Sequence, residues 1–105
     1  MTAEMIYCTT GSHREAVAIS RALVEERLAA CVNILPSITS LYWWEGKVQE
    51  GQEAALIIKT RRELVDDVIA RVKQLHSYDC PCVVSLAIEK GNSDFLEWVA
   101  KETKQ

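Results

Sequence analysis

The chain has 105 residues, enough for one hydrophobic core and too few for two, so we expect a single domain over residues 1–105. Hydrophobic residues make up 49% of it and charged residues 26%, which is typical of a folded protein and excludes a disordered one. The formal net charge is −3, and no basic run is longer than Arg61-Arg62. This charge argues against nucleic acids and acidic membranes as partners.

The sequence carries no signal for a membrane or for secretion. Its longest stretch without a formal charge, residues 28–44, contains a proline and several polar residues and is too short and too polar to span a bilayer. Residues 1–4 lead directly into a strand-like segment, without the features of a signal peptide. We therefore expect a cytoplasmic protein. In that reducing compartment its four cysteines should be free thiols.

The first two predicted elements are a strand and a helix. Residues 5–10 are rich in β-formers and end at Gly11. Ser12 and Glu15 then match a capping box, in which each residue satisfies a backbone donor at the start of a helix. Apolar residues recur at helical spacing as far as Leu28, where we expect the helix to end.

A long hairpin is predicted next. Residues 31–44 are strand-like, and Pro36 within them predicts a bend or a sheet edge. Glu45-Gly46 is a tight-turn signal, because glycine supplies the positive φ that such turns need. The returning strand, residues 47–60, is polar in its first half, where Gly51 suggests a bulge.

The second half of the chain predicts a helix, a strand and a short helix. Thr60 and Glu63 match a second capping box, and clear helical periodicity follows as far as Leu75. Residues 83–88 are apolar on both faces, which predicts a central strand. A C-terminal helix is expected to begin near Asn92-Ser93.

The resulting order is βαββαβ plus a C-terminal helix. It predicts an α+β, ferredoxin-like fold, with an antiparallel sheet, helices on one face and an extended hairpin. The other sheet face would be exposed, yet residues 54–58 and 83–88 are too apolar for contact with water. We therefore expect a homo-oligomer that covers this face.

Three motifs closely resemble the CutA family, also called the divalent-ion or periplasmic divalent-cation tolerance proteins. They are LAACVNILP at residues 28–36, SLYWWEGK at 40–47 and HSYDCP at 76–81, and the resemblance extends over residues 7–98. It implies a ferredoxin-like homotrimer similar to the PII signalling proteins, with the sheets inside and the hairpins gripping neighbouring subunits. It also implies a link to tolerance of copper and other divalent ions.

The resemblance suggests metal ligands as well. Copper binding in the family has been proposed through a cysteine near the end of the first strand and a histidine just after the second helix, which correspond to Cys8 and His76. Cys82 stands where the family usually has a glutamate, which replaces a carboxylate with a thiol.

The motif Cys80-Pro81-Cys82 supports a metal site on its own. Proline favours an extended residue before it, and residues i and i+2 of an extended chain point to the same side. Together with His76, the two thiols offer soft ligands suited to Cu(I) or Zn(II). The alternative is that the cysteines are small apolar residues packed in the interior. The predicted ligands are Cys8, His76, Cys80 and Cys82.

Two further groups of residues are candidates for contacts. An aromatic cluster on the hairpin is expected to pack or to contact another subunit, and its members are Tyr42, Trp43 and Trp44. A polar cleft between subunits, of the kind that binds small anions in related trimers, would be lined by Lys59, Tyr78 and Asp79.

The sequence contains no Gly-x-Ser-x-Gly, His-Glu-x-x-His, Walker or dinucleotide-binding motif, so we expect a binding protein and not an enzyme. Our first hypothesis is a cytoplasmic homotrimer that binds copper or another thiophilic metal and contributes to divalent-cation tolerance. The alternative is a PII-like signalling or scaffold trimer that binds a small metabolite or a partner protein. A third hypothesis is a trimer that binds neither.

Overall fold

The computed structural model describes residues 2–105. Its four-stranded antiparallel sheet has the order β2-β3-β1-β4. The succession of elements confirms the predicted ferredoxin-like βαββαβ order with a C-terminal helix. Among residues 2–105, no helix is both long and apolar enough to cross a membrane. The elements are β1 (Ala3–Thr10), α1 (His13–Glu25), β2 (Cys31–Trp44), β3 (Lys47–Arg61), the 3-10 turn η1 (Arg62–Leu64), α2 (Val65–Leu75), β4 (Val83–Ile88) and α3 (Ser93–Glu102).

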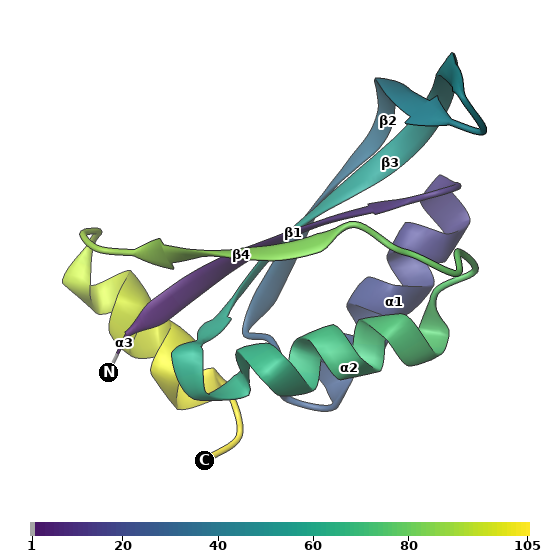
Figure 1. The fold of residues 1–105 in the computed structure, drawn as a ribbon. Helices are drawn as coiled ribbons and strands as arrows, with labels where there is room; N and C mark the ends of the chain where they lie inside the picture. Colours follow the sequence, from purple (N-terminus) through teal and green to yellow (C-terminus); the bar gives the residue numbers. More distant parts are fainter. Residues whose placement is uncertain (1) are drawn as a thin grey trace.

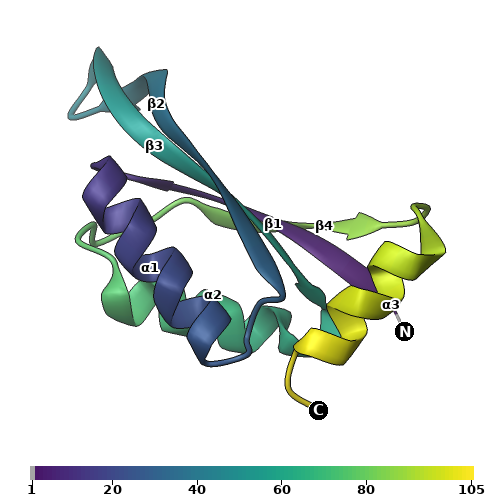
Figure 2. The same ribbon diagram turned by 180° about the vertical axis from the view of Figure 1, so that it is seen from behind.

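Helices α1 and α2 lie on the same side of the sheet, and the hairpin of β2 and β3 extends well beyond them (Figure 1). The view from behind shows the same two layers, with α3 at the end of the molecule away from the hairpin tip (Figure 2). The projecting hairpin makes the molecule elongated, with dimensions of 44 × 25 × 22 Å.

One sheet face packs on α1 and α2, and we call it the covered face. Ile6 and Cys8 of β1 lie opposite Ile58 and Leu56 of β3, and all four side chains are fully buried. They form one apolar core with residues of both helices, because the apolar stripe of each helix faces the sheet. The helix residues of this core include Ala16, Ile19, Leu23, Val68 and Val72.

The opposite sheet face, which we call the open face, carries the alternate residues of the same strands. In β4, Val84 and Leu86 are 53% and 63% exposed, and Leu35 of β2 is also exposed. The prediction that residues 83–88 form a central strand is wrong, since β4 pairs only with β1 and lies at the edge of the sheet. Its apolar residues face the core on one side and the unpartnered open face on the other.

Helix α1 begins as predicted. The Ser12 side chain accepts a hydrogen bond from the backbone N–H of Glu15 at 3.1 Å. The Glu15 carboxylate accepts from the N–H of Gly11 and not from that of Ser12, so only half of the predicted capping box forms.

The same helix ends at Glu25, three residues before the predicted end. Arg27 adopts a positive φ of 61°, and the N–H of Leu28 donates to the carbonyl of Leu23 at 2.9 Å. The N–H of Arg27 donates to Val24 at 3.1 Å, which completes a Schellman motif. Leu28 is buried after the helix and not within it.

The hairpin turn is the one predicted. Glu45 and Gly46 both have positive φ values, 52° and 77°, as in the turns that match the twist of a two-residue hairpin.

The irregularity of the hairpin lies in β2. Pairing shifts between Leu35 and Ile38, so Pro36 disrupts the ladder in an edge strand, as expected. The predicted bulge at Gly51 is wrong, because Gly51 pairs in regular register with Ser40.

The second predicted capping box is also wrong. Thr60 is still part of β3, opposite Glu4, and its hydroxyl donates to the carbonyl of Leu28 at 2.6 Å. The 3-10 turn η1 then precedes α2, and no side chain caps either element. Thr60 and Glu63 have the spacing of a capping box, but β3 continues as far as Arg61, so Thr60 does not lie at a helix start.

Candidate functional site

The segment between α2 and β4, residues 76–82, lies against the end of β1, and a buried histidine holds it there. The ring Nε2 of His76 lies 2.7 Å from the carbonyl oxygen of Thr9, and its Nδ1 accepts from the N–H of Tyr78 at 3.0 Å. A carbonyl oxygen only accepts, so Nε2 is the donor in the bond to Thr9, while Nδ1 is the acceptor in the bond from Tyr78. Both ring nitrogens are thus engaged, and neither is free to bind a metal.

A carboxylate anchors the same segment to the start of α1. Glu15 accepts hydrogen bonds from the N–H and hydroxyl of Ser77, at 2.7 and 3.0 Å, and from the N–H of Gly11 at 3.2 Å. Burial alone raises the pKa of Glu15, but these hydrogen bonds to the ionised form outweigh burial and keep the pKa below its ordinary value. Glu15 therefore stabilises this segment as an anion.

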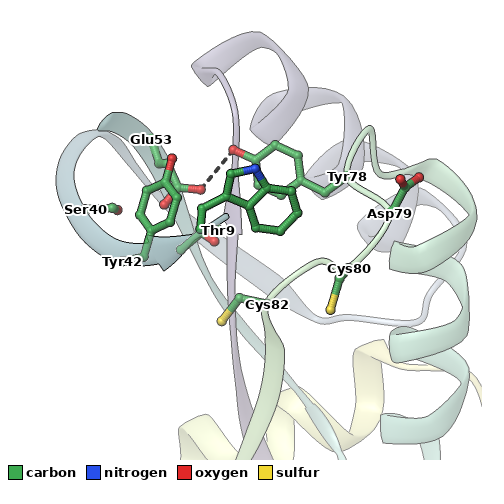
Figure 3. Close-up of a pocket in the computed structure, with 9 residues that line it drawn as sticks. Thr9, Ser40, Tyr42, Glu53, Tyr78, Asp79, Cys80 and Cys82 are labelled. Atoms are coloured by element: carbon green, nitrogen blue, oxygen red, sulfur yellow. Dashed lines mark hydrogen bonds between the residues drawn. The ribbon is translucent and has the colours of Figure 1, made fainter. Parts of the chain in front are cut away.

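A cavity of about 630 Å³ lies between this segment and the hairpin (Figure 3). The Tyr78 hydroxyl donates to a carboxylate oxygen of Glu53 at 2.9 Å. Burial, together with this bond and the nearby negative charge, raises the pKa of Tyr78 to about 12. The cavity is lined by Thr9, Ser40, Tyr42, Trp44, Glu53, Tyr78, Asp79, Cys80 and Cys82.

Two thiols belong to this cavity. Cys80 and Cys82 are both exposed free cysteines, and Figure 3 shows their sulfur atoms on the same side of the segment. This is the arrangement expected for residues i and i+2 of a chain without helical structure.

The third predicted thiol ligand lies elsewhere. Cys8 has no exposed surface and belongs to the core of the covered face. Burial, reinforced by the negative charge of neighbouring groups, raises the pKa of Cys8 to about 12, so the thiolate that binds metals is strongly disfavoured. Among residues 2–105, no three His, Cys, Asp or Glu side chains are grouped as a metal site. The four predicted ligands therefore do not form one cluster within a subunit.

Only part of the predicted cleft comes together. Tyr78 and Asp79 line the cavity, whereas Lys59 does not. Lys59 is opposite Met5, and its ammonium group donates to the side-chain oxygen of Asn33 and to the carbonyl of Ile57. Among the described residues that line the cavity, none is basic, and the acidic ones are Glu53 and Asp79. The charge of the cavity is therefore negative.

The aromatic cluster of the hairpin is divided between two surfaces. Tyr42 and Trp44 line the cavity, and Trp43, which is 75% exposed, does not. Alternation along a strand accounts for this division.

Sequence reasoning missed the acidic groups that organise the site. Glu53 lies in the polar half of the hairpin, 25 residues before its partner Tyr78. Glu15 was recognised only as a capping residue, although it also binds Ser77. No spacing pattern connects these residues, because only the register of the hairpin and the path of residues 76–82 bring them together.

Comparison with known proteins now identifies the family. The sequence model of the CutA1 divalent ion tolerance protein family matches residues 4–102. The chain belongs to the CutA1 family. It is 48% identical over 94 residues to the divalent-cation tolerance protein CutA of Archaeoglobus fulgidus, covering 90% of this chain and 91% of that protein. These matches confirm the resemblance drawn from the three motifs.

A plant relative and a solved plant structure extend the comparison. The chain is 45% identical over 101 residues to the rice protein CutA 1, chloroplastic, covering 96% of this chain and only 57% of the rice protein. The crystal structure of CutA1 from Oryza sativa superposes with a TM-score of 0.98 at 43% identity, over 100% of this chain and 96% of that one. The ferredoxin-like fold is therefore that of solved CutA1 proteins.

Proposed function

We propose that this CutA1 chain contributes to divalent-cation tolerance as a homotrimer that binds a soft metal ion, copper above all, through Cys80 and Cys82. Relatives from Archaeoglobus fulgidus and Thermus thermophilus are named divalent-cation tolerance proteins, and the proposal extends that role to this chain. The observation that carries it is the pair of exposed thiols on one wall of the cavity. The role is one of binding, without a catalytic step.

The donor set favours Cu(I). Thiolate ligands select soft ions, and Cu(I) is stable with two of them. Structural Zn(II) takes four ligands in a tetrahedron, and within residues 2–105 no three candidate side chains form a group. A single subunit therefore fits a two-coordinate soft ion better than zinc.

Cys8 and His76 remain part of the proposal only if the site rearranges. Metal binding at His76 would break its bond to Thr9 or to Tyr78, and binding at Cys8 would need an ionised thiol inside the core. We therefore assign the first bound ion to Cys80 and Cys82.

Anaerobic competition between the protein and a coloured Cu(I) chelator tests this assignment. We expect one Cu(I) per subunit and a loss of affinity of at least a hundredfold in Cys80→Ser and in Cys82→Ser, since each removes one of two ligands. Cys31→Ser is the matched control, because Cys31 does not line the cavity. Unchanged affinity in both cavity variants would refute the assignment. A loss of affinity confined to Cys8→Ser or His76→Gln would show that the ion binds at Cys8 or His76 instead.

The apolar open face supports the trimer. Val84 and Leu86 at one edge of this face and Leu35 at the other are exposed hydrophobic residues, which soluble proteins usually bury against a partner when they belong to a large apolar surface. Light scattering should give about three times the subunit mass of 11.8 kDa. Leu86→Arg should reduce that mass by placing a charge on the proposed interface, and a monomeric wild-type protein would contradict the proposal.

The cavity also favours a second function, that of a PII-like signalling or scaffold trimer. Its aromatic residues Tyr42, Trp44 and Tyr78 would bind a small molecule by stacking, and Glu53 and Asp79 would favour a cation over an anion. Titration of Trp fluorescence with choline and with ATP tests this alternative. Quenching by choline that is lost in Trp44→Leu would support it.

We also propose that residues 1–105 act as one cytoplasmic domain. The four free thiols suit a reducing compartment. Fractionation of cells that express the chain from its own promoter tests the location, and recovery from an oxidising compartment would contradict it.

A further inference from the structure

The four cysteines differ sharply in their surroundings, and two of them form a pair. Cys8 is buried and Cys31 is half-buried, whereas Cys80 and Cys82 are exposed and line the same cavity. Exposure is the first requirement for a thiol that reacts with oxidants. A neighbouring thiol is the second, because it can resolve an oxidised partner before further oxidation occurs.

The backbone between the two thiols leaves room for them to approach each other. The chain bends at Cys80 and joins no helix or strand before Val83. The carbonyl of Cys82 accepts from the N–H of Thr9 at 3.3 Å, which fixes one end of the motif to β1. Both sulfur atoms project to the same side of the segment (Figure 3). Closure to a disulfide therefore requires rotation of both side chains and a movement of the backbone at this bend, where no helix or strand holds the chain.

We propose that Cys80 and Cys82 form a reversible redox pair, which closes to an intramolecular disulfide on oxidation by hydrogen peroxide. One thiolate attacks the peroxide, the O–O bond breaks, and a sulfenic acid and water result after protonation. The second thiol attacks the sulfenic sulfur, the S–O bond breaks, and a second water leaves. The two sulfur atoms together lose two electrons, the peroxide gains them, and two thiols plus one peroxide become one disulfide plus two waters.

The disulfide is expected to be easily reduced. A bridge between residues i and i+2 closes a small ring, and strained or exposed disulfides have higher reduction potentials than buried structural ones. Two molecules of glutathione restore both thiols and leave as glutathione disulfide. The reaction is therefore a switch and not a permanent crosslink.

Closure has a consequence for the proposed metal site. The disulfide removes both thiolates, so the oxidised protein cannot hold Cu(I) at this position. Formation of the disulfide itself does not depend on metal binding and goes beyond the proposed function.

Trypsin offers a direct test, because cleavage after Lys and Arg places the cysteines on three different peptides. Cys8 falls in residues 1–14, Cys31 in residues 28–47, and Cys80 and Cys82 together in residues 74–90. The native protein is treated with one equivalent of hydrogen peroxide, alkylated and digested. We expect peptide 74–90 to lose two hydrogen atoms, to resist alkylation and to remain unlinked to any other peptide. Incubation with glutathione should restore the original mass.

Matched variants decide the outcome. Cys82→Ser and Cys80→Ser should each abolish the two-hydrogen loss, and Cys31→Ser should retain it. Circular dichroism before treatment checks that each variant is folded. A disulfide that links peptide 74–90 to either of the other peptides, or to a second copy of itself, would overturn the proposal. Full alkylation of both cysteines after peroxide treatment would also overturn it.

A second readout separates this inference from the metal proposal. Cu(I) binding is measured on the reduced and the oxidised protein with the same chelator. Disulfide formation in a protein that binds no Cu(I) would uphold the redox pair and refute the metal site. Tight Cu(I) binding without disulfide formation would do the reverse.

Discussion

The covered and open faces of one sheet both carry apolar side chains, but they differ in whether this chain buries them. On the covered face, Leu56 and Ile58 are fully buried by the subunit's own helices. On the open face, Val84 and Leu86 are exposed, and no helix of the described residues covers them. The comparison teaches that the core on the covered face is complete within one chain, whereas the exposed apolar residues of the open face are the basis of the proposed trimer.

The reactive groups follow a similar division. The groups enclosed by the fold, Cys8 and His76, are fully buried. Cys80 and Cys82 have no such constraints and remain exposed to solvent. A cysteine or histidine can therefore react with a metal or an oxidant only where the fold neither buries its side chain nor occupies it with hydrogen bonds.

The largest effect we expect is in thiol reactivity. At about pH 8, a thiol with a pKa of about 12 is ionised to about one part in ten thousand, and Cys8 is also inaccessible. We expect Cys80 and Cys82 to react with iodoacetamide on the order of a thousandfold faster than Cys8. Mass spectrometry of the three tryptic peptides over time measures the rates. Comparable rates for Cys8 in the folded protein would contradict its burial.

The next effect compares the two faces directly. Leu56→Ala should lower the free energy of unfolding by about 3 kcal/mol, because the subunit itself buries this side chain and a cavity remains. Leu86→Ala should cost an isolated subunit less than about 0.5 kcal/mol, because the side chain is exposed there.

Urea denaturation over a range of protein concentrations measures both variants. In the proposed trimer, the cost of Leu86→Ala should rise well above 0.5 kcal/mol, since the partner's surface covers this position in the assembly. A negligible cost at every concentration would mean that the open face stays in contact with water.

The sequence predicted the fold well where local chemistry determines the structure. Alternating and periodic apolar residues gave the element order, and Ser12 and Gly46 marked a helix start and a turn. The prediction failed where a residue adopts a backbone conformation that its type does not usually favour. Arg27 takes the left-handed position that usually belongs to glycine, so the end of α1 was placed too late.

Other failures have a tertiary cause. Thr60 has the spacing of a helix cap, but pairing with β1 keeps it in the sheet. Residues 83–88 are apolar enough for a central strand, and the sequence does not reveal that β4 is at an edge. The candidate site was predicted only in part. Its neighbours in sequence were found, namely Tyr78, Asp79, Cys80 and Cys82. Glu53 was missed, because only the fold of the hairpin brings it to the cavity.

A smaller effect is expected from the two carboxylates beside residues 76–82. Glu15 accepts three hydrogen bonds and Glu53 one from Tyr78. Glu15→Gln should therefore lower stability by about 1–2 kcal/mol near pH 7. Glu53→Gln, the matched control, should cost less than half of that, because its amide oxygen still accepts from Tyr78.

The pH dependence of stability follows from the lowered pKa of Glu15. A carboxyl group whose pKa is lower in the folded than in the unfolded state stabilises the fold above the unfolded value, here 4.5. That stabilisation is lost as the pH falls below 4.5 through the folded pKa. The difference between wild type and Glu15→Gln should thus shrink on acidification, as measured by urea denaturation at fixed protein concentration. A difference that stays constant down to about pH 3 would contradict the role of the ionised carboxylate.

The smallest effect concerns the tyrosine that closes the cavity. Tyr78→Phe removes one hydrogen bond to Glu53 at a partly exposed position, so we expect a loss of about 0.5–1 kcal/mol. The raised pKa makes this stabilisation complete below the ordinary value of 10.0, and it is lost as the pH rises through about 12. Ultraviolet titration of tyrosinate should show a late step in the wild type that is missing in Tyr78→Phe. The same late step in both proteins would show that it does not come from Tyr78 and would contradict the role of the bond to Glu53.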